Sequence, residues 1–446
     1  MTDHAATFLS GVIEGFYGKP WTASERSTLV EWMSRWGLNT YFYAPKDDLH
    51  HRALWRERYQ ESGALELAQM IAACRQRQIR FVYALSPGLD IRYHDEGEVD
   101  RIRARFEQVM AMGGEHFSLL FDDIPGQLDP IDLQRWGSLA SAQCHVANVV
   151  FAWIRGRIPH ARFVFCPTAY CGRMAARKLG GDNYLETIGR TLLPDIDVFW
   201  TGPDIVSRQI TVEHVQELQR VLNRKPLIWD NLNANDYDGR RFFCGPYAGR
   251  PPQLRDMVSG LLSNPNNEFP LNYVPLRSLA DFTHLTGEWE PRRSYLGGVE
   301  EWLKTFATVT APIRLEDLIL FCDCFYLPHE DGAEAEAFYQ CAARLVTGAA
   351  PPAVDDVTAF KAQVARLREV CDRITELRYR PMFHALYRRI WDLREQLDLI
   401  DRYVAFRTGQ GVGAAATSSF PLPAVKHPGL LARLRQLVVE HAATTP

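Results

Sequence analysis

Two adjacent aspartates, Asp122 and Asp123, are the residues of this sequence best suited to acid–base chemistry. They directly follow the apolar run 117–121, which predicts a buried strand. Carboxylates side by side at a strand end repel each other and lose hydration, which favours a raised pKa and a retained proton on one of them. The pair therefore suits an acid working beside a charged partner; the simpler alternative is a solvated loop or a helix cap.

The adjacency of the two aspartates also restricts the mechanism. Neighbouring residues of an extended strand point to opposite sides. Direct displacement instead needs carboxyl groups about 5–5.5 Å or about 6.5–9.5 Å apart on either side of one scissile bond. We therefore favour a mechanism in which the substrate supplies its own nucleophile. One aspartate would polarise a neighbouring substrate group, and the other would be the general acid.

The elements that must position this pair alternate in type over the first 290 residues. Short β-branched or aromatic runs predict strands at 8–16, 39–45, 80–87, 116–124, 162–170, 195–202, 226–231 and 268–275. Amphipathic stretches predict helices near 24–37, 64–78, 98–113, 132–158, 182–193, 212–224, 253–263 and 277–287, with Ser24, Asp182 and Thr211 as caps. Strict alternation of eight strands and eight helices is typical of a (β/α)8 barrel. The competing doubly wound sheet would usually carry a GxGxxG loop, which GFYGKP does not match.

No strand is predicted after about residue 290. Helical periods run through 296–309, 314–326, 333–348, 354–377, 382–409 and 428–442, and the Gly/Ala/Ser/Pro-rich stretch 409–429 is expected to be a long loop. The sequence thus predicts a catalytic barrel over 1–290 and an all-α, stalk-like domain over 291–446.

Composition excludes several classes of protein. The chain is 46% hydrophobic and 23% charged, as in ordinary globular proteins, and its net charge of -4 disfavours a nucleic-acid binder. It has no apolar run long enough for a membrane span and no recognisable signal peptide. Nine cysteines without a CxxC pair predict a reduced, cytoplasmic protein. The adjacent His50 and His51 lack spaced partners, so we expect no metal site and no cofactor.

Polar or aromatic residues follow seven of the expected strands. In a (β/α)8 barrel the carboxyl ends of all strands meet on one face, where active sites form. The strand ends concerned are 14–18, 44–48, 86–88, 122–123, 168–170, 200–202 and 229–231, with 235–237 following the last. Their convergence on one face favours an enzyme site.

Nine blocks of the sequence resemble glycoside hydrolase family 84, the family of the O-GlcNAcases and related hexosaminidases, and in particular its compact members. The blocks are GVIEGFYGKPW (11–21), YAPKDD (43–48), SPGLDI (86–91), LLFDDI (119–124), FCPTAYCG (165–172), WTGPDIVS (200–207), WDNLNANDYD (229–238), GPYAGR (245–250) and LSNPNNEFPLNYVP (262–275). The resemblance implies a (β/α)8 barrel and a retaining mechanism in which the 2-acetamido oxygen of N-acetylglucosamine (GlcNAc) is the nucleophile. Asp122 would polarise that acetamido group, and Asp123 would protonate the leaving oxygen and then activate water.

The resemblance also implies a set of substrate-binding residues. They are Gly15 and Lys46 for sugar hydroxyls, Tyr170, Trp229 and Asn231 for the acetamido group, Cys166 and Thr201 as its neighbours, Asp236 for the 4- and 6-hydroxyls, Asn264 for the 3-hydroxyl side and Tyr237 for pocket shape. Simpler interpretations exist: Gly15 could serve a turn, Lys46 could pair with Asp47 or Asp48, and Asp236 and Asn264 could cap helices. Tyr170 and Trp229 could be core aromatics, and Cys166 a small buried hydrophobe. Ala169 stands where animal members carry Glu.

The function expected from this resemblance is removal of O-linked GlcNAc from proteins or glycopeptides. The alternatives are a β-N-acetylhexosaminidase of free glycans and a GlcNAc-binding protein without catalysis. A homodimer through the helical domain is one option for its quaternary structure. No nucleic-acid or membrane partner is expected.

Overall fold

The computed structural model describes residues 8–348, 353–409 and 429–444, and it divides into two compact units. One unit runs up to Asp236 and also includes Tyr247–Phe269 and Leu279–Trp289. The other contains Tyr237–Pro246, Pro270–Ser278 and the chain from Glu290 onward. The assignment of 1–290 and 291–446 as separate functional domains remains a prediction.

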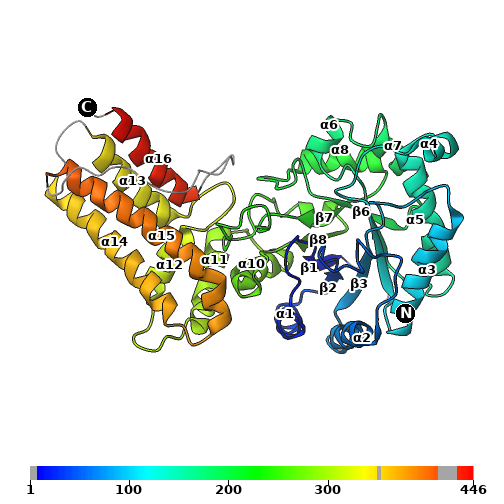
Figure 1. The fold of residues 1–446 in the computed structure, drawn as a ribbon, viewed down its shortest axis with the longest axis horizontal. Coiled ribbons are helices and arrows are strands. Elements are labelled where there is room, and N and C mark those ends of the chain that lie inside the picture. The colour runs from blue at the N-terminus through cyan, green and yellow to red at the C-terminus, as the bar shows by residue number, and fades with distance from the viewer. Residues whose placement is uncertain (1–7, 349–352, 410–428, 445–446) are drawn as a thin grey trace. The chain divides into compact units, whose positions relative to one another are not determined.

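The first unit is built around a closed barrel of eight parallel strands in sequence order (Figure 1). The strands are β1 (Leu9–Glu14), β2 (Thr40–Tyr43), β3 (Arg80–Leu85), β4 (His116–Leu120), β5 (Phe163–Cys166), β6 (Ile196–Trp200), β7 (Leu227–Asp230) and β8 (Gly260–Ser263). The barrel closes where β1 pairs with β8, beginning with Leu9 opposite Gly260. The predicted (β/α)8 fold is confirmed.

Helices connect the strands. They are α1 (Ala23–Trp36), α2 (Glu61–Gln76), α3 (Glu96–Ala111), α4 (Pro130–Trp136), α5 (Leu139–Arg155), α6 (Gly172–Ala176), α7 (Tyr184–Thr191), α8 (Val212–Leu222), α9 (Leu254–Met257) and α10 (Tyr273–Thr283), the last preceded by the 3-10 turn η2 (Phe269–Asn272). Thr211 caps α8 as predicted. At α1, however, Thr22 rather than Ser24 is the cap, because it forms a reciprocal capping box with Glu25. The cap position of α7 is Asn183, not Asp182, and its side chain makes no capping bond.

The eighth strand is not where the periodicity placed it. The predicted strand 268–275 is η2 followed by the first turn of α10, and β8 lies within the predicted helix 253–263. Pro275 is tolerated there because the first turn of a helix leaves backbone N–H groups unpaired in any case. Gly260 suits β8 because a Cβ at this position would lie 2.3 Å from the Leu9 carbonyl oxygen.

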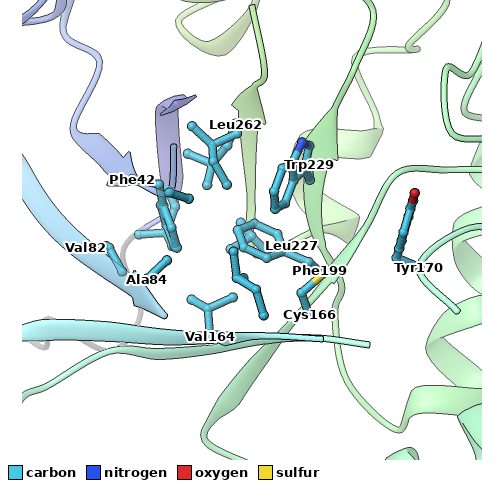
Figure 2. Close-up of a cluster of buried hydrophobic side chains, with 14 of the residues drawn as sticks. Phe42, Val82, Ala84, Val164, Cys166, Tyr170, Phe199, Leu227, Trp229 and Leu262 are labelled. Atoms are coloured by element: carbon cyan, nitrogen blue, oxygen red, sulfur yellow. The ribbon is translucent and has the colours of Figure 1, made fainter. Parts of the chain in front are cut away.

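Alternate residues of the strands fill the barrel interior. Figure 2 shows side chains from β2, β3, β5, β6, β7 and β8 converging on one cluster. Its members are Leu9, Ile13, Phe42, Ala44, Val82, Ala84, Leu120, Val164, Cys166, Tyr170, Cys171, Phe199, Leu227, Trp229 and Leu262. Side chains alternate in direction along a strand. Because Ile13 and Trp229 point into the barrel, their neighbours Glu14 and Asp230 point to the opposite side.

The second unit is helical, with α11 (Pro291–Trp302), the short turn η3 (Leu303–Thr305), α12 (Leu315–Asp323), α13 (Ala333–Thr347), α14 (Val354–Thr375), α15 (Arg380–Arg407) and α16 (Gly429–Thr444). The fully buried Asp323 ties its first helices together, accepting two bonds from Arg292 and one from the Tyr295 hydroxyl. Most of the predicted loop 409–429 falls outside the described residues. No helix within the described ranges is long and apolar enough to cross a bilayer.

Candidate active site

The two aspartates lie just beyond β4, and the backbone gives them different directions. β4 ends at Leu120, so the pair is not in an extended strand as predicted. Asp122 is buried, whereas Asp123 is exposed and adopts a left-handed φ of 53°. Aspartate is one of the few non-glycine residues that tolerate this conformation. Each carboxylate therefore has its own set of partners.

Lys46, which follows β2, pairs with Asp122. Its Nζ lies 2.5 Å from Asp122 Oδ2, and the two side chains are only 1% and 7% exposed. Asp122 Oδ1 is also buried, and among the described residues it has no hydrogen-bond partner. Asp47 and Asp48, the simpler partners for Lys46, are engaged elsewhere: Asp47 accepts from the Gly18 N–H, and Asp48 from two tyrosine hydroxyls. The buried pair thus leaves one carboxylate oxygen of Asp122 without a donor among the described residues.

Two tyrosine hydroxyls hold Asp123. The Tyr17 hydroxyl donates to Oδ2 at 2.9 Å, and the Tyr170 hydroxyl donates to Oδ1 at 2.8 Å. Burial, with the Asp123 charge next in importance, raises the pKa of Tyr17 and of Tyr170 well above the usual value, so both phenols stay protonated donors. Arg52 donates to the Tyr17 oxygen and to the Asp123 carbonyl.

Trp229 forms an aromatic wall beside the aspartates. Its ring packs edge-on against Phe199, with centroids 5.2 Å apart, and Lys46 Nζ lies 5.6 Å from its centroid. A Cβ at Gly15 would lie 2.4 Å from the Trp229 ring. Gly15 is therefore needed for the close approach of this ring rather than for a left-handed turn.

A chain of amides fixes the Trp229 ring. Asn231 Oδ1 accepts from Trp229 Nε1 at 3.0 Å and from Asn264 Nδ2 at 2.9 Å. Asn264 Oδ1 in turn accepts from the Gly15 N–H at 3.3 Å. Asn264 is thus a link between β1 and β8 and not a helix cap.

Asp236 is tied to the Asp123 side of the site. Its Oδ2 accepts from the Tyr17 backbone N–H at 3.0 Å, so it too is not a helix cap. Thr201 lies close to Tyr170, since its N–H donates to the Tyr170 carbonyl at 2.9 Å, and Cys166 is buried in the interior cluster. Tyr237 belongs to the second unit, where its ring stacks on Phe243, and its role in the pocket remains a prediction.

Some polar residues at the strand ends point away from the barrel interior and bond residues outside it. Glu14 accepts from Arg26 and from the Trp21 N–H, on the side where α1 packs. Asp230 is buried in a bidentate pair with Arg250. Convergence on one end of the barrel therefore does not by itself place a side chain in the site.

Arg52 and His51 are residues that the sequence did not indicate as site members, and it indicated Tyr17 only as part of the strand end 14–18. Tyr17 stands in the first block of the resemblance, but nothing in its type predicted a bond to Asp123. The His51 ring donates from Nδ1 to the Ala84 carbonyl, and its buried Nε2 has no partner among the described residues. Arg52 and His51 lie beyond their strand, where only the folded loop shows what they contact.

Among the described residues, one group has the spacing of a metal site: His94, Asp129 and Asp132. Its members already have protein partners. Asp129 caps α4, and Asp132 accepts from the Tyr93 N–H and pairs with His94. The group is thus accounted for by local structure.

A closed parallel barrel with a carboxylate pair and an aromatic wall at the carboxyl ends of its strands is the arrangement of a barrel glycosidase. A family model described as beta-N-acetylglucosaminidase matches residues 10–315. The chain belongs to this family, glycoside hydrolase family 84.

Known relatives agree with this assignment. The protein O-GlcNAcases of Rattus norvegicus and Mus musculus are each 44% identical over 276 residues, which is 62% of this chain but 30% of theirs. A solved structure of a mutant Thermobaculum terrenum O-GlcNAc hydrolase has a TM-score of 0.82 and 25% identity, covering 98% of this chain and 94% of its own. The match thus extends through both units for the bacterial structure, but spans less than a third of the mammalian chains.

Proposed function

We propose that this protein is a retaining exo-β-N-acetylglucosaminidase that removes O-linked GlcNAc from proteins by substrate-assisted catalysis. The observation that carries the proposal is the buried Asp122 Oδ1, which lacks a partner among the described residues while Oδ2 is held by Lys46. A buried carboxylate oxygen without a donor is costly unless a ligand supplies one. The 2-acetamido N–H is such a donor.

The first step would form the oxazoline. Asp122 accepts the acetamido N–H, which increases the electron density on the acetamido oxygen. That oxygen attacks the anomeric carbon while the bond to the leaving oxygen breaks, and protonated Asp123 transfers its proton to the leaving group. The Asp122 carboxylate also stabilises the positive charge that develops on the ring and the acetamido group.

The second step would reverse the role of Asp123. As a carboxylate it takes a proton from water, which attacks the anomeric carbon and opens the oxazoline. The configuration is retained after two inversions, and Asp123 regains its proton for the next turnover. Its bonds from Tyr17 and Tyr170 support the carboxylate form between the two steps.

The remaining residues would bind the sugar. Trp229 walls the N-acetyl pocket with Cys166 and Thr201 beside it, Tyr170 and Asn231 contact the acetamido group, and Gly15, Lys46, Asp236 and Asn264 bind hydroxyls. Tyr237 would shape the pocket. The bonding around Trp229 supports an aromatic wall held in one place, which a small acetyl methyl requires.

We also infer a cytoplasmic protein, and keep a homodimer through the helical domain as a hypothesis. All nine cysteines are buried and free of disulfides, as expected in a reducing compartment. Light scattering coupled to gel filtration tests the dimer: a single species of monomer mass would exclude it.

The experiment compares wild type, Asp122→Asn and Asp123→Asn on aryl β-N-acetylglucosaminides with a good and a poor leaving group. A second series fluorinates the N-acetyl methyl, which weakens its oxygen as a nucleophile. We expect the wild-type rate to fall steadily with fluorination and Asp123→Asn to lose far more on the poor leaving group. A hydrolysis rate that does not change across the fluorinated series would exclude the acetamido oxygen as the nucleophile.

Two further outcomes separate the alternatives. Wild type that binds GlcNAc but cleaves no substrate would be a binding protein. Cleavage of GlcNAc-terminated free glycans with no cleavage of O-GlcNAc peptides would favour the hexosaminidase.

A further inference from the structure

We infer that Arg52 is a positioning residue for the acid–base step, acting through Tyr17 and through the backbone of Asp123. The inference rests on the proposed function, because it takes Asp123 as the group that protonates the leaving oxygen. Arg52 lies in the loop after β2. It donates to the Tyr17 hydroxyl and to the Asp123 carbonyl oxygen, whereas the Asp123 Oδ2 atom accepts from Tyr17.

The guanidinium of Arg52 holds two points of the site at once. Nη1 lies 2.5 Å from the Tyr17 hydroxyl oxygen, and Nη2 lies 2.8 Å from the Asp123 carbonyl oxygen. The guanidinium carbon is also 5.6 Å from the centroid of the Tyr17 ring. Arg52 itself is only 8% exposed, and both of its bonds are charge-assisted.

The bond to the carbonyl bears on an unusual backbone conformation. Asp123 has a φ of 53°, in the left-handed region that is unfavourable for most residues with a Cβ. A charged donor on the carbonyl of this same residue stabilises that conformation. Since the backbone angle sets the direction of the side chain, Arg52 helps to aim the carboxyl of Asp123.

The bond to Tyr17 fixes the direction of a proton. A guanidinium can only donate, so the Tyr17 oxygen must accept from Arg52. The single hydroxyl hydrogen of Tyr17 is then left for Asp123 Oδ2. Without Arg52, that hydroxyl could rotate to other acceptors or to water.

The backbone of Tyr17 is anchored independently of Arg52. Its N–H donates to Asp236, and its carbonyl accepts from the side-chain amide of Asn267 at 2.6 Å. Loss of the guanidinium should therefore change the orientation of the hydroxyl and of Asp123 without releasing the loop. This separates a positioning role from a merely structural one.

The test measures kcat/KM of Arg52→Met, Arg52→Lys and Tyr17→Phe on aryl β-N-acetylglucosaminides with a good and a poor leaving group. General-acid assistance contributes roughly 10²–10⁴-fold where the leaving group needs a proton. We expect Arg52→Met to lose about 10²-fold on the poor leaving group and only a few-fold on the good one. Arg52→Lys should recover only part of the loss. A single ammonium group cannot reach both the Tyr17 hydroxyl oxygen and the Asp123 carbonyl oxygen as the planar guanidinium does.

Arg162→Met is the matched control. Arg162 is 9% exposed and pairs with Asp197 at the amino ends of β5 and β6, the opposite end of the barrel from Asp123. We expect it to lower the melting temperature without changing the ratio of the two rates. The double variant Arg52→Met/Tyr17→Phe should lose much less kcat/KM than the product of the two single fold-losses. The reason is that both residues act through the same series of hydrogen bonds to Asp123.

Three outcomes overturn the inference. These are equal losses on both leaving groups, the same pattern in Arg162→Met, or independent losses in the double variant. Failure of the proposed function would give a different result. The wild-type rate would then not change with fluorination of the N-acetyl methyl, or the wild type would cleave neither substrate. In that case the proposed role of Arg52 would also be wrong.

Discussion

Lys46 and Asp122 form a buried ion pair that uses only one of the two carboxylate oxygens. Nζ is 2.5 Å from Oδ2, and Oδ1 has no partner among the described residues. The lysine compensates the charge at Oδ2, and Oδ1 is left as an acceptor without a donor. The pair therefore combines charge compensation at one carboxylate oxygen with an unused acceptor at the other.

Replacing Lys46 with Met should leave Asp122 as an unpaired buried carboxylate. Breaking such a pair costs about 3–5 kcal/mol of folding free energy. Loss of the lysine that holds Asp122 Oδ2 should also lower kcat by about 10²–10³-fold, the range for one group that stabilises transition-state charge. Thermal melting and steady-state kinetics measure the two effects. The control is Arg26→Met, which breaks the buried pair with Glu14 outside the site and should lower stability alone.

Replacing Gly15 with Ala should displace the Trp229 ring, because the new Cβ would lie 2.4 Å from it. We expect kcat/KM for N-acetylglucosaminides to fall at least about tenfold, or about 1.4 kcal/mol of transition-state stabilisation. The comparison is Gly297→Ala in α11, where a Cβ meets nothing within 4 Å. That change should add about 0.5–1 kcal/mol of stability and leave the kinetics unaltered. Unchanged kinetics in Gly15→Ala would mean that the ring position does not matter.

Replacing Asn231 with Ala should loosen the aromatic wall, since Trp229 Nε1 and Asn264 Nδ2 both lose their acceptor. A looser wall discriminates less between acyl groups. We expect the ratio of kcat/KM for N-acetyl over N-propionyl substrates to fall several-fold. Asn148→Ala is the control, because Asn148 bonds backbone atoms near residues 191–193, between α7 and β6. A preserved ratio in Asn231→Ala would exclude this role.

The buried His51 should make the protein sensitive to acid. Burial and the nearby Lys46 lower the pKa of this imidazole from 6.5 to about 3, so the folded state resists a proton that the unfolded chain accepts. Its contribution to stability is complete above pH 6.5 and is lost as the pH falls toward 3, by about 1.4 kcal/mol per pH unit.

His51→Gln should therefore flatten the dependence of unfolding free energy on pH between about pH 6 and pH 4. Urea unfolding at several pH values measures this slope. His160→Gln, at an exposed position, should keep the wild-type slope. An identical slope in His51→Gln would show that other groups govern acid unfolding.

Most of the barrel could be predicted from sequence because its strands are short apolar runs between amphipathic helices. The eighth strand could not, because only two residues separate Gly260–Ser263 from α9 and its leucines continue the helical period of that segment. The aromatic segment 268–275 resembled a strand more closely, although its two prolines suit helix starts equally well.

The strand-end pattern predicts the aspartate pair, and the resemblance adds the Trp229 wall. The structure places both at one end of the barrel. The way they are held could not be predicted. The left-handed turn at Asp123 and the reach of Arg52 to it depend on loop conformations that leave no periodic signal. Glu14 and Asp230 show the converse, because a strand-end position alone does not say which side a residue faces.

The bond from the Gly15 N–H to Asn264 joins residues 249 positions apart in the chain. It lies beside the β1–β8 pairing that closes the barrel. During synthesis, β1 therefore waits without its second neighbour until residue 263 has left the ribosome. A nascent chain released before that point would have neither a closed barrel nor the Asn264 bonds that support the Trp229 ring. Proteases and chaperones would recognise such a chain, and it would not bind sugar.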